Sequence, residues 1–107
     1  MSTDENKAVL HRLMQELAQG NLDILNEHPG LDDVRPMLMQ LLDLRKTMTI
    51  QEQIEEMIAE GDWVAVRVIR IGGPFGDGVE EIAMCKIVDG KIVKQHSQGG
   101  PLLDERN

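Results

Sequence analysis

The feature that most constrains the fold is a run of alternating β-branched residues in the second half of the chain, followed by two turn signals. Valine occupies every second position at Val64, Val66 and Val68, a pattern typical of a half-buried strand. A glycine-rich loop over residues 72–78 leads into a second apolar run over 79–88. Asp89-Gly90 then strongly favours a two-residue hairpin turn. Residues 91–98 are expected to form the returning strand, with Gly99-Gly100-Pro101 ending it, so this half predicts an antiparallel meander.

Helical patterns occupy the first 45 residues. Ser2 and Glu5 have the spacing of a capping box. Apolar residues then recur at helical spacing up to Gly20, which predicts a helix from about Asp4 to Gln19. Asn21 is expected to cap a short second helix that stops before the His28-Pro29-Gly30 breaker.

A third helix is expected after that breaker. Asp32 or Asp33 is the expected cap, and Pro36 falls in the first turn, where its missing N–H costs little. Four residues at helical spacing predict its buried stripe: Val34, Leu38, Leu41 and Leu42. Helices first and antiparallel strands afterwards indicate an α+β protein, in which helices cover one face of a curved sheet.

The segment from Thr49 to Glu60 fits two patterns. Thr49 with Glu52 has capping-box spacing, several apolar residues follow at helical intervals, and Gly61 is a good helix terminator. The same segment also alternates in a way that could face a sheet, although Glu and Gln are poor strand formers. Local propensity alone favours a helix here.

Composition indicates one globular domain and excludes several functions. The chain has 107 residues, 41% of them apolar and 28% charged, with a formal net charge of -8. We therefore expect no nucleic-acid partner, because phosphate binding needs clustered cations, and no membrane partner, because apolar runs are short. One cysteine and no apparent secretory signal predict a cytoplasmic protein. Zinc, nucleotide and hydrolase motifs are absent from the sequence, so we expect neither a metal nor a cofactor.

Four phrases of the sequence, taken together, resemble the SnoaL-like polyketide cyclase branch of the nuclear-transport-factor-2-like superfamily. They are Gln19-Gly20-Asn21-Leu22-Asp23, the segment His28-Pro29-Gly30 with the helix after it, Ile58-Ala59-Glu60-Gly61-Asp62-Trp63-Val64-Ala65-Val66-Arg67, and Ile87-Val88-Asp89-Gly90-Lys91-Ile92-Val93. The resemblance spans nearly the whole chain. It implies a cone-shaped α+β barrel, a homodimer formed through the sheet, and a strand rather than a helix over residues 48–59.

The resemblance also guides the choice of site residues. His96 is the candidate acid or base, because an imidazole can transfer protons near neutral pH. Strand alternation would place Ile92, Lys94, His96 and Gln98 on one face, so Lys94 and Gln98 are candidate ligand-binding residues. Two further ligand-binding candidates are His28, where the family has a pocket rim, and Trp63. The family's terminal catalytic acid is replaced by Gly100.

Two other groups could reach a cavity. Glu52, Glu55 and Glu56 could supply an acid if their segment is a strand that faces a cavity, although such a charged run is more often solvated. Cys85 is expected to be a small core residue rather than a nucleophile.

The sequence leaves two functions open. In the first, the protein binds a small apolar or carbonyl-bearing molecule and acts as a cofactor-independent isomerase, cyclase or hydratase by proton transfer. In the alternative, it is a non-catalytic binding module or a dimeric assembly module of the same fold. An open pocket favours the first, and a filled one favours the second.

Overall fold

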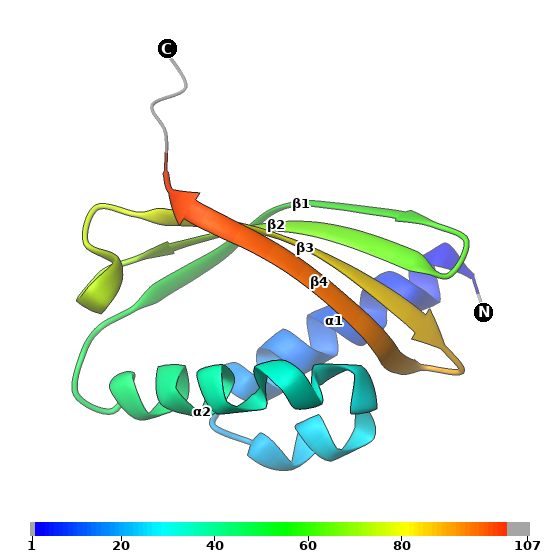
Figure 1. Ribbon diagram of the computed structural model, residues 1–107, viewed down its shortest axis with the longest axis horizontal. Helices are drawn as coiled ribbons and strands as arrows, with labels where there is room; N and C mark the ends of the chain where they lie inside the picture. The colour runs from blue at the N-terminus through cyan, green and yellow to red at the C-terminus, as the bar shows by residue number, and fades with distance from the viewer. Residues whose placement is uncertain (1, 103–107) are drawn as a thin grey trace.

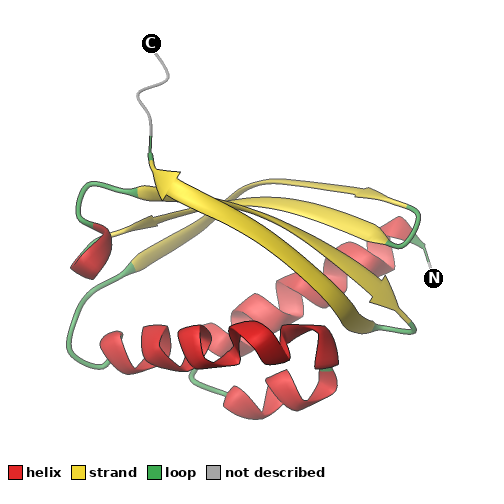
Figure 2. Ribbon diagram, viewed as in Figure 1, coloured by secondary structure: helices red, strands yellow, loops and turns green. Residues whose placement is uncertain are grey.

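The computed structural model describes residues 2–102 and combines helices with one antiparallel sheet. Figure 1 shows the helices of the first half of the chain gathered on one side of a curved sheet, and Figure 2 distinguishes helices from strands by colour. This arrangement confirms the α+β prediction. In chain order the elements are α1 (Thr3–Ala18), η1 (Leu22–Glu27), η2 (Pro29–Val34), α2 (Arg35–Leu44), β1 (Gln51–Glu60), β2 (Trp63–Ile71), η3 (Gly73–Phe75), β3 (Val79–Val88) and β4 (Lys91–Pro101).

The first helix begins with the predicted capping box. The Glu5 N–H donates to Ser2 Oγ at 3.1 Å, and the Ser2 N–H donates to Glu5 Oε1 at 3.0 Å. These bonds satisfy two of the backbone donors that every helix start leaves open. The helix buries Leu10 and Leu13 against the sheet.

The predicted start of the third helix was wrong. Asp32 and Asp33 lie inside the short 3-10 helix η2, and α2 begins at Arg35 after Val34, which provides no side-chain cap. These two residues belong to η2 because η2 already begins at Pro29, six residues before α2. Pro36 does lie in the first turn of α2, as predicted.

The predicted buried stripe of this helix is only half-buried. Val34, Leu38, Leu41 and Leu42 face the sheet, but α2 contains no fully buried residue. The reason is a cavity beneath the helix, which these side chains line.

The four strands form a meander in the order β1-β2-β3-β4, each antiparallel to the next. The turn between β3 and β4 is the predicted Asp89-Gly90 hairpin, with positive φ at both residues (52° and 77°). Strand β4 continues through Gly99 and Gly100, which pair with Glu81 and Glu80. The prediction that these glycines end the strand was therefore wrong.

The contested segment is a strand, as the resemblance implied. β1 pairs with β2 along its whole length, but the register shifts between Ile54 and Glu56. Glu55 is the extra residue of a β-bulge. The bulge moves the inward face from Glu52 and Ile54 to Met57, a step of three residues. The apolar residues of this segment therefore recur at helical spacing because the bulge adds one residue to the alternation of the strand.

A second bulge corrects the predicted faces of β4. The register against β3 shifts between Lys86 and Ile87, which leaves Val93 as the extra residue between Ile92 and Lys94. Ile92 is fully buried, but Lys94 and His96 are exposed. Gln95 and Ser97 share the inner face with Ile92, so the simple alternation predicted for this strand was wrong.

The core lies between the helices and the inner face of the sheet. Its largest fully buried apolar side chains are Ile24, Leu25, Val64, Ile87 and Ile92. Among the described residues, no helix combines the length and apolarity that crossing a membrane requires.

Candidate functional site

A cavity lies between the helices and the inner face of the sheet. It has a volume of about 100 Å³. For comparison, an engineered cavity of about 150 Å³ binds benzene. Its walls are mostly apolar, and they include Leu13, Leu17, Leu38, Leu41, Val66 and Ala83. The cavity is therefore suited to an apolar group of modest size.

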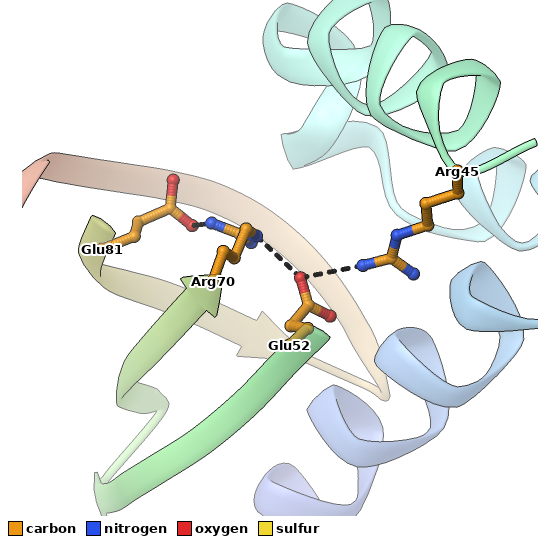
Figure 3. Close-up of polar contacts among 4 residues, drawn as sticks. All are labelled: Arg45, Glu52, Arg70 and Glu81. Atoms are coloured by element: carbon orange, nitrogen blue, oxygen red, sulfur yellow. Dashed lines mark hydrogen bonds and ion pairs between the residues drawn. The ribbon is translucent and has the colours of Figure 1, made fainter. Parts of the chain in front are cut away.

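One end of the cavity is charged. Four residues from three strands and the end of α2 line it and form a chain of ion pairs: Arg45, Glu52, Arg70 and Glu81. Glu52 Oε2 lies 3.3 Å from Arg45 Nη2 and 2.7 Å from Arg70 Nε, and Arg70 Nη1 lies 3.2 Å from Glu81 Oε1 (Figure 3).

The strand register explains why three of these residues meet. Glu52 and Arg70 are direct partners across β1 and β2, and Arg70 is diagonal to Glu81 on β3. All three point inward, on the same face as Val66 and Val68. The four side chains are only 13–22% exposed. Pairing is needed at such a depth, since an isolated charge there is costly.

One polar atom of this chain of ion pairs is unsatisfied. Arg45 Nε is buried and has no hydrogen-bond partner among the described residues. A buried N–H without a partner costs about 1–3 kcal/mol. A buried donor at the charged end of the cavity is therefore left unpaired by the residues that the structure describes.

A wider groove adjoins this end. It runs between α1 and the start of β1 and has a mixed lining, in which polar residues such as His11 and Gln53 lie beside apolar ones such as Ile50. Arg45 and Glu52 line both the groove and the cavity. The ion pair between them therefore stands at the junction of the two spaces.

Cys85 also lines the cavity, as a buried thiol. Burial, assisted by the charge of Glu81, raises the pKa of Cys85 to about 11. The thiol is therefore protonated at neutral pH and a poor nucleophile. This agrees with its prediction as a core residue.

His28 is buried away from the main cavity. Its Nδ1 accepts a hydrogen bond of 3.0 Å from the backbone N–H of Ile92, so the histidine ties η2 to β4. Desolvation is the main cause that lowers the pKa of His28; the nearby Glu27 opposes it and Arg12 adds to it. His28 borders a small separate pocket with Arg12 and Glu5. Its role in ligand binding stays a prediction.

The other four predicted site residues lie on the outer face of the sheet. His96 and Trp63 stack there, with ring centroids 6.4 Å apart and an interplanar angle of 23°. Lys94 and Gln98 lie on the same face of β4. The structure brings Trp63 and His96 together, but it places neither of them against the cavity. The proposed catalytic role of His96 and the binding roles of the others stay predictions.

Sequence reasoning found Glu52 but missed Arg45, Arg70 and Glu81. Arg70 could have been found, because it is a charged residue at the next inward position after Val64, Val66 and Val68. Arg45 had no such signal, since its position depends on the turn between α2 and β1.

Among residues 2–102, no group of three or more His, Cys, Asp or Glu side chains could hold a metal ion.

Comparison with known proteins supports the fold. No protein-family model and no curated protein matches this chain. A loop-truncated variant of IdmH has a similar crystal structure, with a TM-score of 0.65 and 18% identity over 88% of this chain and 91% of that one. Wild-type IdmH from Streptomyces antibioticus, provisionally described as a polyketide cyclase, gives a TM-score of 0.64 and 17% identity over the same shares.

At this level of identity the likeness is one of fold. Both the helices and the curved sheet are included, since the match covers nearly all of each chain. The chain therefore shares the fold of these structures, which agrees with the prediction of helices on one face of a curved antiparallel sheet.

Proposed function

We propose that this protein binds a small apolar, carbonyl-bearing molecule in the cavity and transfers a proton to or from it at Glu52. The observation that carries the proposal is the cavity itself, which is apolar along its walls and charged at one end. Ligand sites in proteins commonly combine apolar walls with a few placed polar groups. The similarity to the IdmH structures supports a cyclase-type chemistry.

Glu52 is held in a fixed position at the cavity. Both of its ion pairs are made by Oε2. Arg45 and Arg70 hold the carboxylate in place, and Oε1 makes no hydrogen bond to the residues that the structure describes. A base must be fixed within hydrogen-bond reach of the proton that it removes. The guanidinium of Arg70, which lines the cavity beside Glu52, would then stabilise the negative charge that develops on the carbonyl oxygen.

Binding can be tested with 2-nonanone, an apolar ketone, in a titration followed by amide NMR. We expect shifts at residues of β2 and β3 that line the cavity. Ala83→Leu fills the cavity and should abolish these shifts. Ala65→Leu is the matched control, because Ala65 lies on the outer face of the neighbouring strand and should leave binding unchanged. Binding that survives Ala83→Leu would place the ligand elsewhere.

The reaction can be tested without knowing the substrate. A base at the cavity should catalyse exchange of the ketone's α-protons in D₂O, which proton NMR measures directly. Glu52→Gln keeps the shape and removes the charge, so exchange should fall by about 100-fold or more, as when a general base is lost. Glu56→Gln is the control, since Glu56 lies on the outer face beside Arg67. Equal rates in the two variants would exclude Glu52 as the base.

A second candidate function is assembly through the outer face of the sheet, where the resemblance places a homodimer interface. Ile58, Ile82 and Met84 are all exposed there, beside the stacked Trp63 and His96. Exposed apolar residues gathered on one face favour an interaction surface. This candidate is compatible with a ligand in the cavity, because the two sites lie on opposite faces of the sheet.

A further inference from the structure

We propose that the ligand is amphipathic, with an apolar part in the cavity and a carboxylate that binds Arg45 at the junction with the groove. This inference rests on the proposed function, since it assumes that the cavity binds a ligand. It adds the chemical class of the polar end and the residue that recognises it.

The first support is the position of Arg45. It lines both the mostly apolar cavity and the groove of mixed lining, as do Met14 and Glu52. A molecule that fills the cavity and extends past this junction must pass Arg45. A polar group at its outer end would find partners there in Gln15, Thr49 and Gln53, which line the groove together with apolar residues. The two spaces together fit a molecule with one apolar end and one polar end.

The second support is the unsatisfied donor. Arg45 Nε is buried without a partner among the described residues, and the ion pair of Arg45 with Glu52 is made by Nη2. Arginine presents its N–H groups in a planar fork that matches the two oxygens of a carboxylate. A ligand carboxylate would satisfy Nε and add a second, parallel bond.

The third support is that Glu52 keeps an ion-pair partner if Arg45 moves. Arg70 Nε lies 2.7 Å from Glu52 Oε2, whereas Arg45 Nη2 lies at 3.3 Å. If Arg45 turns to the ligand, Glu52 keeps its shorter ion pair. No charge is then left buried and unpaired, which would otherwise be strongly unfavourable.

The neighbouring charges favour a carboxylate over a phosphate. Glu52 and Glu81 both remain at this end of the cavity. A group with two negative charges would be repelled more strongly by them than a group with one. Arg45 and Arg70 together balance the two glutamates, so a bound carboxylate leaves one negative charge in excess at this end, whereas a doubly charged phosphate leaves two.

The test compares octanoate with 1-octanol, which share an apolar chain and differ in the charged end. Calorimetric titration of the wild-type protein should show octanoate binding about tenfold more tightly than octanol. Arg45→Met should remove this preference by weakening octanoate alone. Lys46→Met is the matched control, because Lys46 is the next residue, carries the same charge and lies outside the cavity. It should keep the preference.

A second measurement avoids dependence on the folding of Arg45→Met. The side-chain Nε–H signal of Arg45 should shift on addition of octanoate to the wild-type protein and stay in place with octanol. Equal affinities for the two molecules, or a preference that survives Arg45→Met, would overturn the inference and leave the proposed function standing. Failure of octanoate and octanol to bind a wild-type protein that binds 2-nonanone would overturn this inference alone, whereas failure of 2-nonanone as well would overturn the proposed function and this inference with it.

Discussion

At the scale of single residues, the structure contains buried polar groups with different tasks. Arg45, Glu52, Arg70 and Glu81 form a chain of ion pairs at the end of a cavity. His28 is buried alone, with one hydrogen bond to the backbone of β4. The first arrangement retains an unsatisfied donor and faces a cavity, which fits ligand binding. The hydrogen bond of His28 holds the start of η2 against β4, and the ionisation of this histidine makes the free energy of unfolding depend on pH.

The first prediction concerns this pH dependence. Burial lowers the pKa of His28 below its ordinary value of 6.5. The unfolded chain therefore takes up a proton near pH 6.5 that the folded protein does not yet bind. The stability contributed by neutral His28 is fully present above pH 6.5 and is lost as the pH falls through the folded-state pKa. The loss from one group cannot exceed about 1.4 kcal/mol per pH unit.

Urea unfolding at pH values from 8 to 5.5 measures this dependence. Stability should stay level above pH 7 and fall below about 6.5. His28→Asn keeps an acceptor near the position of Nδ1 but does not titrate, so its stability should change less over the same range. A wild-type curve with the same slope as that of the variant would show that His28 is not responsible.

At the scale of elements, the sequence predicted whether nearly every segment is a helix or a strand, but not which side chains of each strand point inward. Helix α1 and the Asp89-Gly90 hairpin could be predicted because caps and turns are local. The faces of β1 and β4 could not, because Glu55 and Val93 are bulge residues that reverse which side chains point inward. This reversal is why His96 lies outside and Gln95 lies at the cavity.

The same reasoning explains which site residues could be found. Glu52 was a candidate because a strand in its segment would place it against a cavity. Its partner Arg45 comes from the turn after α2, so their contact depends on how that helix lies over the sheet. Long-range packing of this kind is not encoded in local patterns.

The second prediction concerns the contact between η2 and the bulge of β4. A Cβ atom on Gly30 would lie 2.4 Å from the carbonyl carbon of Val93, which is backbone and cannot rotate away. Gly30→Ala should therefore lower the free energy of unfolding by roughly 1–3 kcal/mol, the usual cost of overpacking. Gly100→Ala is the control, because a Cβ there meets nothing within 4 Å. Urea unfolding of both variants checks this, and similar stabilities would refute the close approach.

At the scale of the whole molecule, the sheet has two faces of different character. The inner face is covered by helices and holds the core and the cavity, while the outer face is left uncovered by them (Figure 1). Aligned across β1, β2, β3 and β4 on the outer face are Ile58, Ala65, Met84 and His96, which are direct cross-strand partners. A second copy of this chain could cover the apolar part of this row.

The third prediction follows from this row. Met84 is 46% exposed on the outer face, and Met39 is 45% exposed on α2. If the outer face forms the homodimer, Met84→Glu should shift the protein from dimer to monomer, because it buries a charge at the interface. Met39→Glu makes the same change at equal exposure but on the helical layer, so it should remain a dimer.

Sedimentation velocity at several concentrations distinguishes these cases through the mass of the particle, which is 12.0 kDa for one chain. The interface is supported if the wild type and Met39→Glu are dimers and Met84→Glu is a monomer. A wild type that stays monomeric at about 100 μM would exclude assembly through this face, because an interface of stable size holds at such a concentration. The proposed ligand site would be unaffected by this outcome, because the cavity lies on the inner face of the sheet.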